Sequence, residues 1–154
     1  MNAKELIDSL ELSPHPEGGY YRRIYTSKEN HSEGRKLISS IHYLLEGEGF
    51  SAFHSLYSTE LWFFHSGEPI NIYQIAPNGE LKISTLSCNL KDNLQLVIEP
   101  NTWFAADIPS KKGYSLVSCT VVPEFSFNHF QLAKREDLIK EYPQHKAIIT
   151  RLTR

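Results

Sequence analysis

Hydrophobic and polar positions alternate with a period of two along most of the chain, which is the spacing of β-strands with one buried face. This period, or short apolar runs, extends from Tyr20 to Arg135. Turn signals interrupt it, among them Asn78-Gly79, a favoured hairpin turn. The pattern predicts nine strands, over residues 19–26, 36–45, 50–56, 60–65, 69–76, 80–86, 94–99, 102–106 and 113–122.

The spacing changes near both ends of the chain. Residues 3–10 place Leu6, Ile7 and Leu10 on one helical face, and the prolines that follow forbid helical continuation. Residues 134–142 predict a second helix ended by Pro143, and residues 145–152 a third. The expected fold is therefore mainly all-β, an antiparallel sandwich or barrel with short N- and C-terminal helices.

Composition narrows the classes of function. A chain of 154 residues with a net charge of −2 fits a single domain over residues 1–154, and the lack of a basic run argues against nucleic acid as a partner. No apolar stretch is long enough to span a membrane, and the charged N-terminus does not resemble a signal peptide. Cys88 and Cys119 stand alone, which predicts reduced thiols and a cytoplasmic location.

The stretch from Phe50 to Gly67 carries the first candidate chemistry. Ala52, His54 and Leu56 share one face of a predicted strand, and the next strand places Glu60 on a matching face. An imidazole beside a carboxylate inside a small barrel is a candidate acid–base couple or half of a metal site. The alternative is a buried histidine with a satisfying partner and only a structural role.

The same stretch resembles the first motif of cupin jelly rolls, G-x5-H-x-H-x3-4-E-x6-G. His54, Glu60 and Gly67 match in register, whereas Leu56 stands at the second histidine. In the best candidate for the second motif, which begins at Pro100, Ala105 replaces the last metal-ligand histidine.

Leucine and alanine have no lone pair for a metal. His54 and Glu60 alone fall short of the three or four protein ligands usual for tight sites. We therefore expect no cofactor and no tightly bound metal. If a metal is bound, His54, Glu60 and His42 are the candidate ligands.

Four stretches of the chain narrow the resemblance to one family of cupins. These stretches, LSPHPEGGYYRRIY, ISSIHYLLEGEGFSAFHSLYSTELWFFHSGEPI, EPNTWFAA and YSLVSCTVVPEFSFNHFQLA, are together similar to the Cupin-5 family. The resemblance covers about residues 12–133 and leaves a C-terminal helical extension over about residues 134–154. One departure is Glu124, where the family usually has a glycine that would permit a positive φ.

This resemblance implies a double-stranded β-helix, an RmlC-like cupin jelly roll. It also implies a homodimer with exchanged N-terminal strands. The prolines and Gly18-Gly19 would then form a turn that leads into an edge strand. The turn either places its side chains near the pocket or only shapes the dimer seam.

A pocket with an aromatic lining and a few polar groups would bind a small molecule. Aromatic walls suit sugar rings, and an arginine suits a phosphate or carboxylate. For any single aromatic side chain, an ordinary place in the β-sheet core is the favoured alternative. The candidate ligand-binding residues are His15, Glu17, Tyr21, Arg23, His42, Trp62, Phe64, Trp103 and Phe127.

Three functions remain open. The first is a metal-independent isomerase or epimerase of a sugar or nucleotide sugar, with His54 as the catalytic base and Glu60 tuning it, an analogy at the level of the fold. The second is a non-catalytic protein that binds or senses a small ligand. The third is a metal-dependent cupin enzyme with an atypical ligand set.

Overall fold

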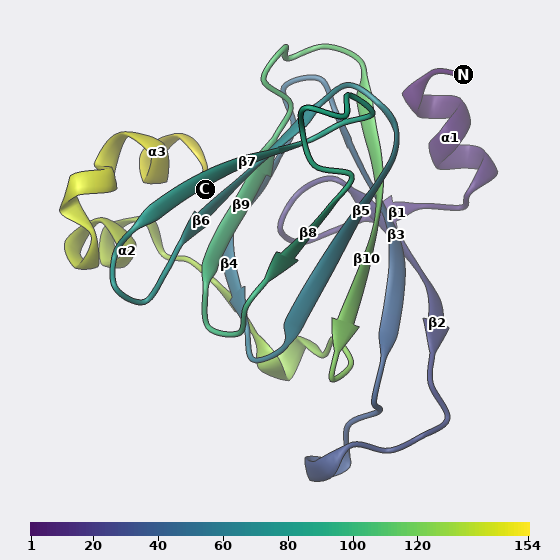
Figure 1. Ribbon diagram of the computed structural model, residues 1–154, viewed down its shortest axis with the longest axis horizontal. Coiled ribbons are helices and arrows are strands. Elements are labelled where there is room, and N and C mark those ends of the chain that lie inside the picture. The colour runs from purple at the N-terminus through teal and green to yellow at the C-terminus, as the bar shows by residue number, and fades with distance from the viewer.

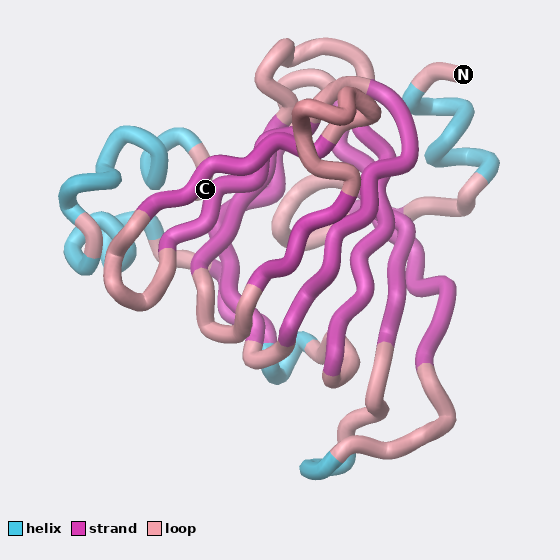
Figure 2. Tube along the Cα trace, viewed as in Figure 1, coloured by secondary structure: helices cyan, strands magenta, loops and turns pink.

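A computed structural model describes all residues 1–154, and β-strands are its main secondary structure (Figures 1 and 2). Fourteen helices and strands follow one another along the chain: α1 (Ala3–Ser9), β1 (Ser13–Pro14), β2 (Tyr20–Thr26), β3 (Ser39–Glu46), β4 (Phe50–Leu56), β5 (Thr59–Gly67), β6 (Ile70–Ile75), β7 (Leu81–Leu86), β8 (Gln95–Ile98), β9 (Trp103–Asp107), β10 (Tyr114–Val122), β11 (Phe130–Leu132), α2 (Arg135–Glu141) and α3 (Lys146–Arg151). Short 3-10 turns lie at Ser32–Gly34, Phe127–His129 and Pro143–His145.

The strands form two antiparallel sheets that pack face to face. One sheet has the order β1-β2-β3-β10-β5-β8, and the other has the order β11-β4-β9-β6-β7. This arrangement fits the predicted jelly roll. The prediction of a β-barrel was wrong, because no strand of one sheet pairs with a strand of the other and the sheets do not close.

The nine predicted strands are all present, with boundaries shifted by at most three residues, and so are the three predicted helices. The alternation missed β1 and β11. These strands are only two and three residues long, too short to show a period. None of the helices has the length and apolar character that a membrane crossing requires.

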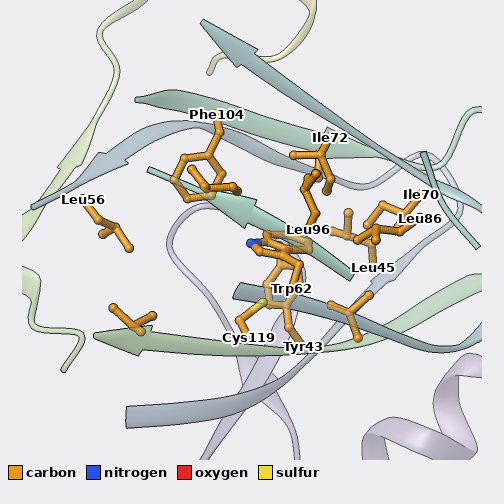
Figure 3. Packing of buried hydrophobic residues seen from close by; sticks show 14 of the residues in the cluster. Tyr43, Leu45, Leu56, Trp62, Ile70, Ile72, Leu86, Leu96, Phe104 and Cys119 are labelled. Carbon is orange, nitrogen blue, oxygen red and sulfur yellow. The ribbon is translucent and has the colours of Figure 1, made fainter. Parts of the chain in front are cut away.

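The main core fills the space between the two sheets. Figure 3 shows Trp62 near its centre, with Tyr43, Cys119 and Phe104 around it. The Trp62 ring lies 5.8 Å from Tyr43 and 6.4 Å from Phe104, centre to centre. Trp62 on β5 and Phe104 on β9 belong to different sheets, so this core holds the layers together.

The C-terminal helices cover the outer face of the second sheet (Figure 1). Leu138 of α2 and Ile149 of α3 pack there against Phe53 and Tyr73. As a result β4 is buried on both faces, with Phe53 toward the helices and His54 toward the space between the sheets.

A buried carboxylate connects helix α3 to the sheet. Asp107 at the end of β9 accepts a hydrogen bond from the Tyr73 hydroxyl at 2.9 Å, forms an ion pair with Lys111 at 2.5 Å, and pairs with Arg151 of α3. Burial alone would raise the pKa of Asp107, but these donors hold it below its ordinary value.

Candidate functional site

A small cavity of about 30 Å³, partly open to solvent, lies between the sheets. Its wall is formed by β2, β3, β5 and β10 of the first sheet and by β4 of the second. The turn before β2 and the segment after β10 complete it. Its lining residues are His15, Glu17, Tyr21, Arg23, Ser39, Ile41, His54, Leu56, Glu60, Cys119, Val121 and Phe125.

The turn His15–Gly19 brings two polar side chains into this cavity. Its backbone closes on itself, with the His15 N–H donating to the Gly19 carbonyl and the Gly18 N–H to the His15 carbonyl, both at 2.9 Å. Gly18 has a φ of 110°, and a Cβ there would lie 2.0 Å from the Phe50 carbonyl oxygen. Only glycine permits this close approach, so the double glycine sets the position of His15 and Glu17.

Glu17 is the direct partner of His54. His54 Nε2 lies 2.9 Å from a Glu17 carboxylate oxygen, and His54 Nδ1 donates to the Ala52 carbonyl at 2.7 Å. Burial alone would lower the pKa of His54, but the Glu17 carboxylate raises it above its ordinary value. Burial would likewise raise the pKa of Glu17, and His54 lowers it. The two groups form a buried ion pair in which both imidazole nitrogens are occupied.

His15 is held in the neutral form with its proton on Nε2. Its Nδ1 accepts the backbone N–H of Glu17 at 3.1 Å, which leaves the proton of the neutral ring on Nε2. Burial lowers the pKa of His15, although the Glu17 carboxylate opposes this effect. Aromatic rings surround the imidazole, with Tyr21 closest at 4.6 Å between ring centres. His15 therefore presents a neutral N–H donor.

Glu60 is buried without a counter-ion. Its side chain is only 6% exposed, and one carboxyl oxygen, Oε2, has no hydrogen-bond partner. Burial raises the pKa of Glu60 to about 7, against the opposing effect of His54. Both His54 and Glu60 line the cavity, as expected, but they do not form an ion pair with each other, because His54 pairs with Glu17.

The structure places the remaining predicted residues in several locations. Tyr21 and Arg23 line the cavity. Trp62 and Phe64 point inward as predicted, but they pack in the core and do not line the cavity. Phe127 is half-exposed, 6.2 Å from the His15 ring. Trp103 packs instead against the C-terminal helices, on the far face of the second sheet.

His42 lies outside the cavity. Its strand neighbours Ile41 and Tyr43 belong to the inner face of β3, so alternation places His42 on the outer face. There its Nδ1 lies 3.3 Å from the Ser118 hydroxyl, which is also 2.6 Å from His65 Nε2. His42 therefore cannot complete a ligand set with His54 and Glu60.

The side chains present do not fit a metal centre. No three His, Cys, Asp or Glu side chains converge in a geometry that could hold a metal ion. His54 has no free nitrogen, and Leu56 stands where the resemblance to cupins led us to expect the second histidine. The expectation that Ala105 holds the last ligand position was wrong, because Ala105 packs with Phe53 on the far face of the second sheet.

Sequence reasoning did not name all of the cavity wall. Ser39, Ile41, Cys119 and Val121 were missed as lining residues, although alternation along residues 113–122 already placed Cys119 and Val121 on one face. Glu124, which stands where the family usually has a glycine, does not have a positive φ. Its carboxylate instead accepts the Lys36 N–H at 3.0 Å.

Comparison with known proteins places the chain in a protein family. The Cupin_5 model, described as Cupin superfamily (DUF985), matches residues 4–133. The chain belongs to the Cupin_5 family. No curated protein matches the sequence.

Solved structures of Cupin_5-like proteins cover the whole chain. Protein SO0799 from Shewanella oneidensis is 40% identical, with 100% of this chain and 98% of that chain covered and a TM-score of 0.96. A hypothetical protein from Leishmania major is 29% identical, with 99% of each chain covered and a TM-score of 0.93. Oxalate decarboxylase from Bacillus subtilis is only 14% identical, with 90% of this chain and 36% of that chain covered, and its TM-score of 0.61 supports the shared cupin fold alone.

Proposed function

We propose that this Cupin_5 protein binds a small polar molecule in the cavity and catalyses proton transfer on it without a metal. The reaction class is isomerisation or epimerisation of a sugar or nucleotide sugar. The observation that carries the proposal is Glu60, a buried carboxyl group in the cavity wall with an unpartnered oxygen and a pKa of about 7. A pKa near the working pH suits a group that both accepts and returns a proton.

In this proposal Glu60 is the base, and not His54 as the sequence suggested. Both nitrogens of His54 are occupied by Ala52 and Glu17, so His54 has no free position for a substrate proton. Its positive charge instead favours the ionised form of Glu60. His54 and Glu17 are therefore positioning residues that set the field in the cavity.

The proposed step uses His15 as a hydrogen-bond donor. Glu60 removes a proton from the carbon beside a carbonyl group, and the electron pair of the broken C–H bond moves toward the carbonyl oxygen. The His15 Nε2–H stabilises the resulting oxyanion, as a neutral imidazole can. A proton passes from the hydroxyl group on the adjacent carbon to this oxyanion, and the Glu60 carboxylic acid returns its proton to the former carbonyl carbon, so that the carbonyl group now lies on the adjacent carbon. One base on one face of the substrate favours isomerisation over epimerisation.

Exchange of substrate hydrogen with solvent tests this function. Sugars, sugar phosphates and nucleotide sugars are incubated with the protein in deuterium oxide, and loss of the C–H signal is followed by NMR. We expect exchange with the wild type, and a loss of about 100-fold or more in Glu60→Gln. Glu80→Gln, a change of an exposed glutamate, is the matched control.

Exchange that Glu60→Gln leaves intact would contradict the proposal. The second candidate, non-catalytic binding, is favoured by the aromatic rings of Tyr21 and Phe125 in the cavity wall. It predicts a thermal shift with a ligand but no exchange. A ligand at 100 times its dissociation constant should stabilise the folded state by about 2.7 kcal/mol.

We further propose a cytoplasmic location, because Cys88 and Cys119 are both free thiols. Besides the small-molecule ligand, we propose that the protein binds a second copy of itself and forms a homodimer with exchanged N-terminal strands.

A further inference from the structure

Two arginines that contact the segment after β10 have no counter-ion, and only one of them lines the cavity. Arg23 lines the cavity, and its Nη2 donates to the Phe125 carbonyl at 2.6 Å. Arg35 is 7% exposed, and its Nη2 donates to the carbonyl of the preceding residue, Glu124, also at 2.6 Å. Both arginines thus hold the same short segment, and neither lies within ion-pair distance of a carboxylate.

The surroundings do not neutralise this charge. The Glu124 carboxylate, in the same segment, accepts the Lys36 backbone N–H and does not pair with either arginine. The Nε of Arg35 is buried and has no hydrogen-bond partner, although its Nη2 also donates to the Ser58 hydroxyl at 2.8 Å. Burial without a counter-ion is costly for Arg35, whereas Arg23 is exposed, so an anion can reach its guanidinium group from solvent.

Inside the cavity the ionisable side chains carry no net positive charge, and Glu60 adds a negative charge when it is ionised. Glu17 and His54 form an ion pair, and His15 is neutral. The mouth is therefore the positive part of the site. Arg23 uses only two of its five N–H donors in contacts with the protein. One donates to the Phe125 carbonyl, and the other makes a long contact of 3.5 Å with the Thr26 hydroxyl.

We propose that the ligand of this cavity is an anion, a sugar-class molecule whose carboxylate or phosphate group binds Arg23 while its uncharged part enters the cavity. This inference rests on the proposed function for the placement of the reacting part beside Glu60. Guanidinium binds both kinds of oxyanion in a bidentate manner.

Arg22 provides a matched control on the same strand. It is the neighbour of Arg23 in β2 and does not line the cavity. Its guanidinium is already paired with Glu11 at 2.8 Å. Arg22→Gln and Arg23→Gln therefore remove the same charge from the same strand, but only the second change removes it from the cavity mouth.

Calorimetric titration with glucose, glucose 6-phosphate and glucuronate tests the inference. We expect the wild type and Arg22→Gln to bind at least one of the two anions more tightly than glucose. Arg23→Gln should weaken that binding by about tenfold or more. Arg23→Lys separates the two anions, because lysine keeps a point charge for a phosphate but cannot form the bidentate contact with a carboxylate.

Three results would overturn the inference: equal binding of glucose and the anions, anion binding that Arg23→Gln leaves unchanged, or no binding of either anion at millimolar concentrations. The solvent-exchange experiment with Glu60→Gln does not depend on Arg23. Absence of solvent exchange in the wild type, together with Arg23-dependent anion binding, would contradict the proposed function alone.

Discussion

At the scale of single residues, two buried glutamates of the cavity differ because their partners differ. Glu17 has His54 at 2.9 Å, which lowers the pKa of its carboxyl group. Glu60 has no ion-pair partner, and burial raises its pKa to about 7. One carboxylate therefore stays ionised while the other can gain and lose a proton near neutral pH, a division of roles that is common in acid–base sites.

Glu60 should make the protein less stable as the pH rises. Its pKa in the folded state exceeds the ordinary value of 4.5, so between pH 4.5 and about 7 the folded protein binds more protons than the unfolded chain. Relative to Glu60→Gln, the free energy of unfolding of the wild type should fall by up to about 3 kcal/mol from roughly pH 4 to pH 8. Urea denaturation at a series of pH values measures this difference. Parallel curves for wild type and variant would contradict the raised pKa.

Glu17→Gln should destabilise the protein most near pH 6. The Glu17 contribution is present above pH 4.5 and is lost as the pH falls through its lowered pKa. The His54 contribution is present below pH 6.5 and is lost as the pH rises through its raised pKa. Between these limits the variant leaves a buried charge without its partner, at a cost of about 3–5 kcal/mol.

Glu11→Gln is the control for this prediction. It breaks the ion pair with Arg22, in which both side chains are exposed, and should change the free energy of unfolding by less than about 1 kcal/mol. Similar, small effects of the two variants in chemical denaturation would rule out a strong Glu17–His54 pair.

At the scale of elements, the site depends on a turn that connects several parts of the fold. The Glu17 carbonyl accepts the Ala52 N–H at 2.7 Å and a guanidinium N–H of Arg154 at 2.7 Å, so β4 and the C-terminus both hold the turn. The Tyr43 hydroxyl of β3 donates to the Gly18 carbonyl at 2.6 Å. These contacts fix the backbone between His15 and Glu17.

Gly18→Ala should therefore be far more harmful than Gly34→Ala. Both glycines have positive φ angles, 110° and 73°, but a Cβ at Gly34 meets no atom within 4 Å. Gly34→Ala should cost about 1–2 kcal/mol from backbone strain alone. Gly18→Ala adds a clash with the Phe50 carbonyl, and we expect a larger loss together with weaker ligand binding. Equal melting temperatures for the two variants would contradict this account of the turn.

At the scale of the whole molecule, the open pair of sheets leaves strand edges free. β1 pairs with β2 only through Ser13 and Pro14, so the rest of the outer edge of β2 has no strand beside it. Ile24 and Tyr25 on this strand are 48% and 54% exposed. An uncovered edge with exposed apolar side chains favours association with another strand.

We predict a homodimer in solution. A second copy can cover the β2 edge, with or without exchange of the strand between subunits. Light scattering at micromolar concentration should give twice the mass of 17.7 kDa. Introducing a proline at Tyr25 should shift the protein toward monomer, because proline removes a backbone donor from the edge. A purely monomeric wild type would contradict the prediction.

The purified protein should also carry little tightly bound metal. His54 is engaged on both nitrogens and His42 lies on the other face of β3, so neither can join Glu60 in a ligand set. Elemental analysis after dialysis should find well below one transition metal ion per chain. A stoichiometric metal would favour the third function considered, a metal-dependent cupin with an atypical ligand set.

Much of the fold could be predicted because its signals are local. Alternating apolar positions defined the nine longer strands, and prolines marked the ends of the helices. Periodicity does not report which strands pair across the molecule, so the expected barrel was replaced by two sheets that do not close. The two shortest strands were missed for a related reason, since they exist only through their pairing with β2 and β4.

The candidate site, like the fold, could be predicted from the sequence only in part. The sequence by itself determined that His54 and Glu60 face inward, since strand period fixes the face of each side chain, and that Gly18-Gly19 form a sharp turn. Only the tertiary structure decided the partners: Glu17 pairs with His54, Glu60 is left without a counter-ion, and Trp103 and His42 lie outside the cavity. The physical reason is that partnership and burial depend on distances between segments far apart in the chain, and these distances arise when the sheets pack.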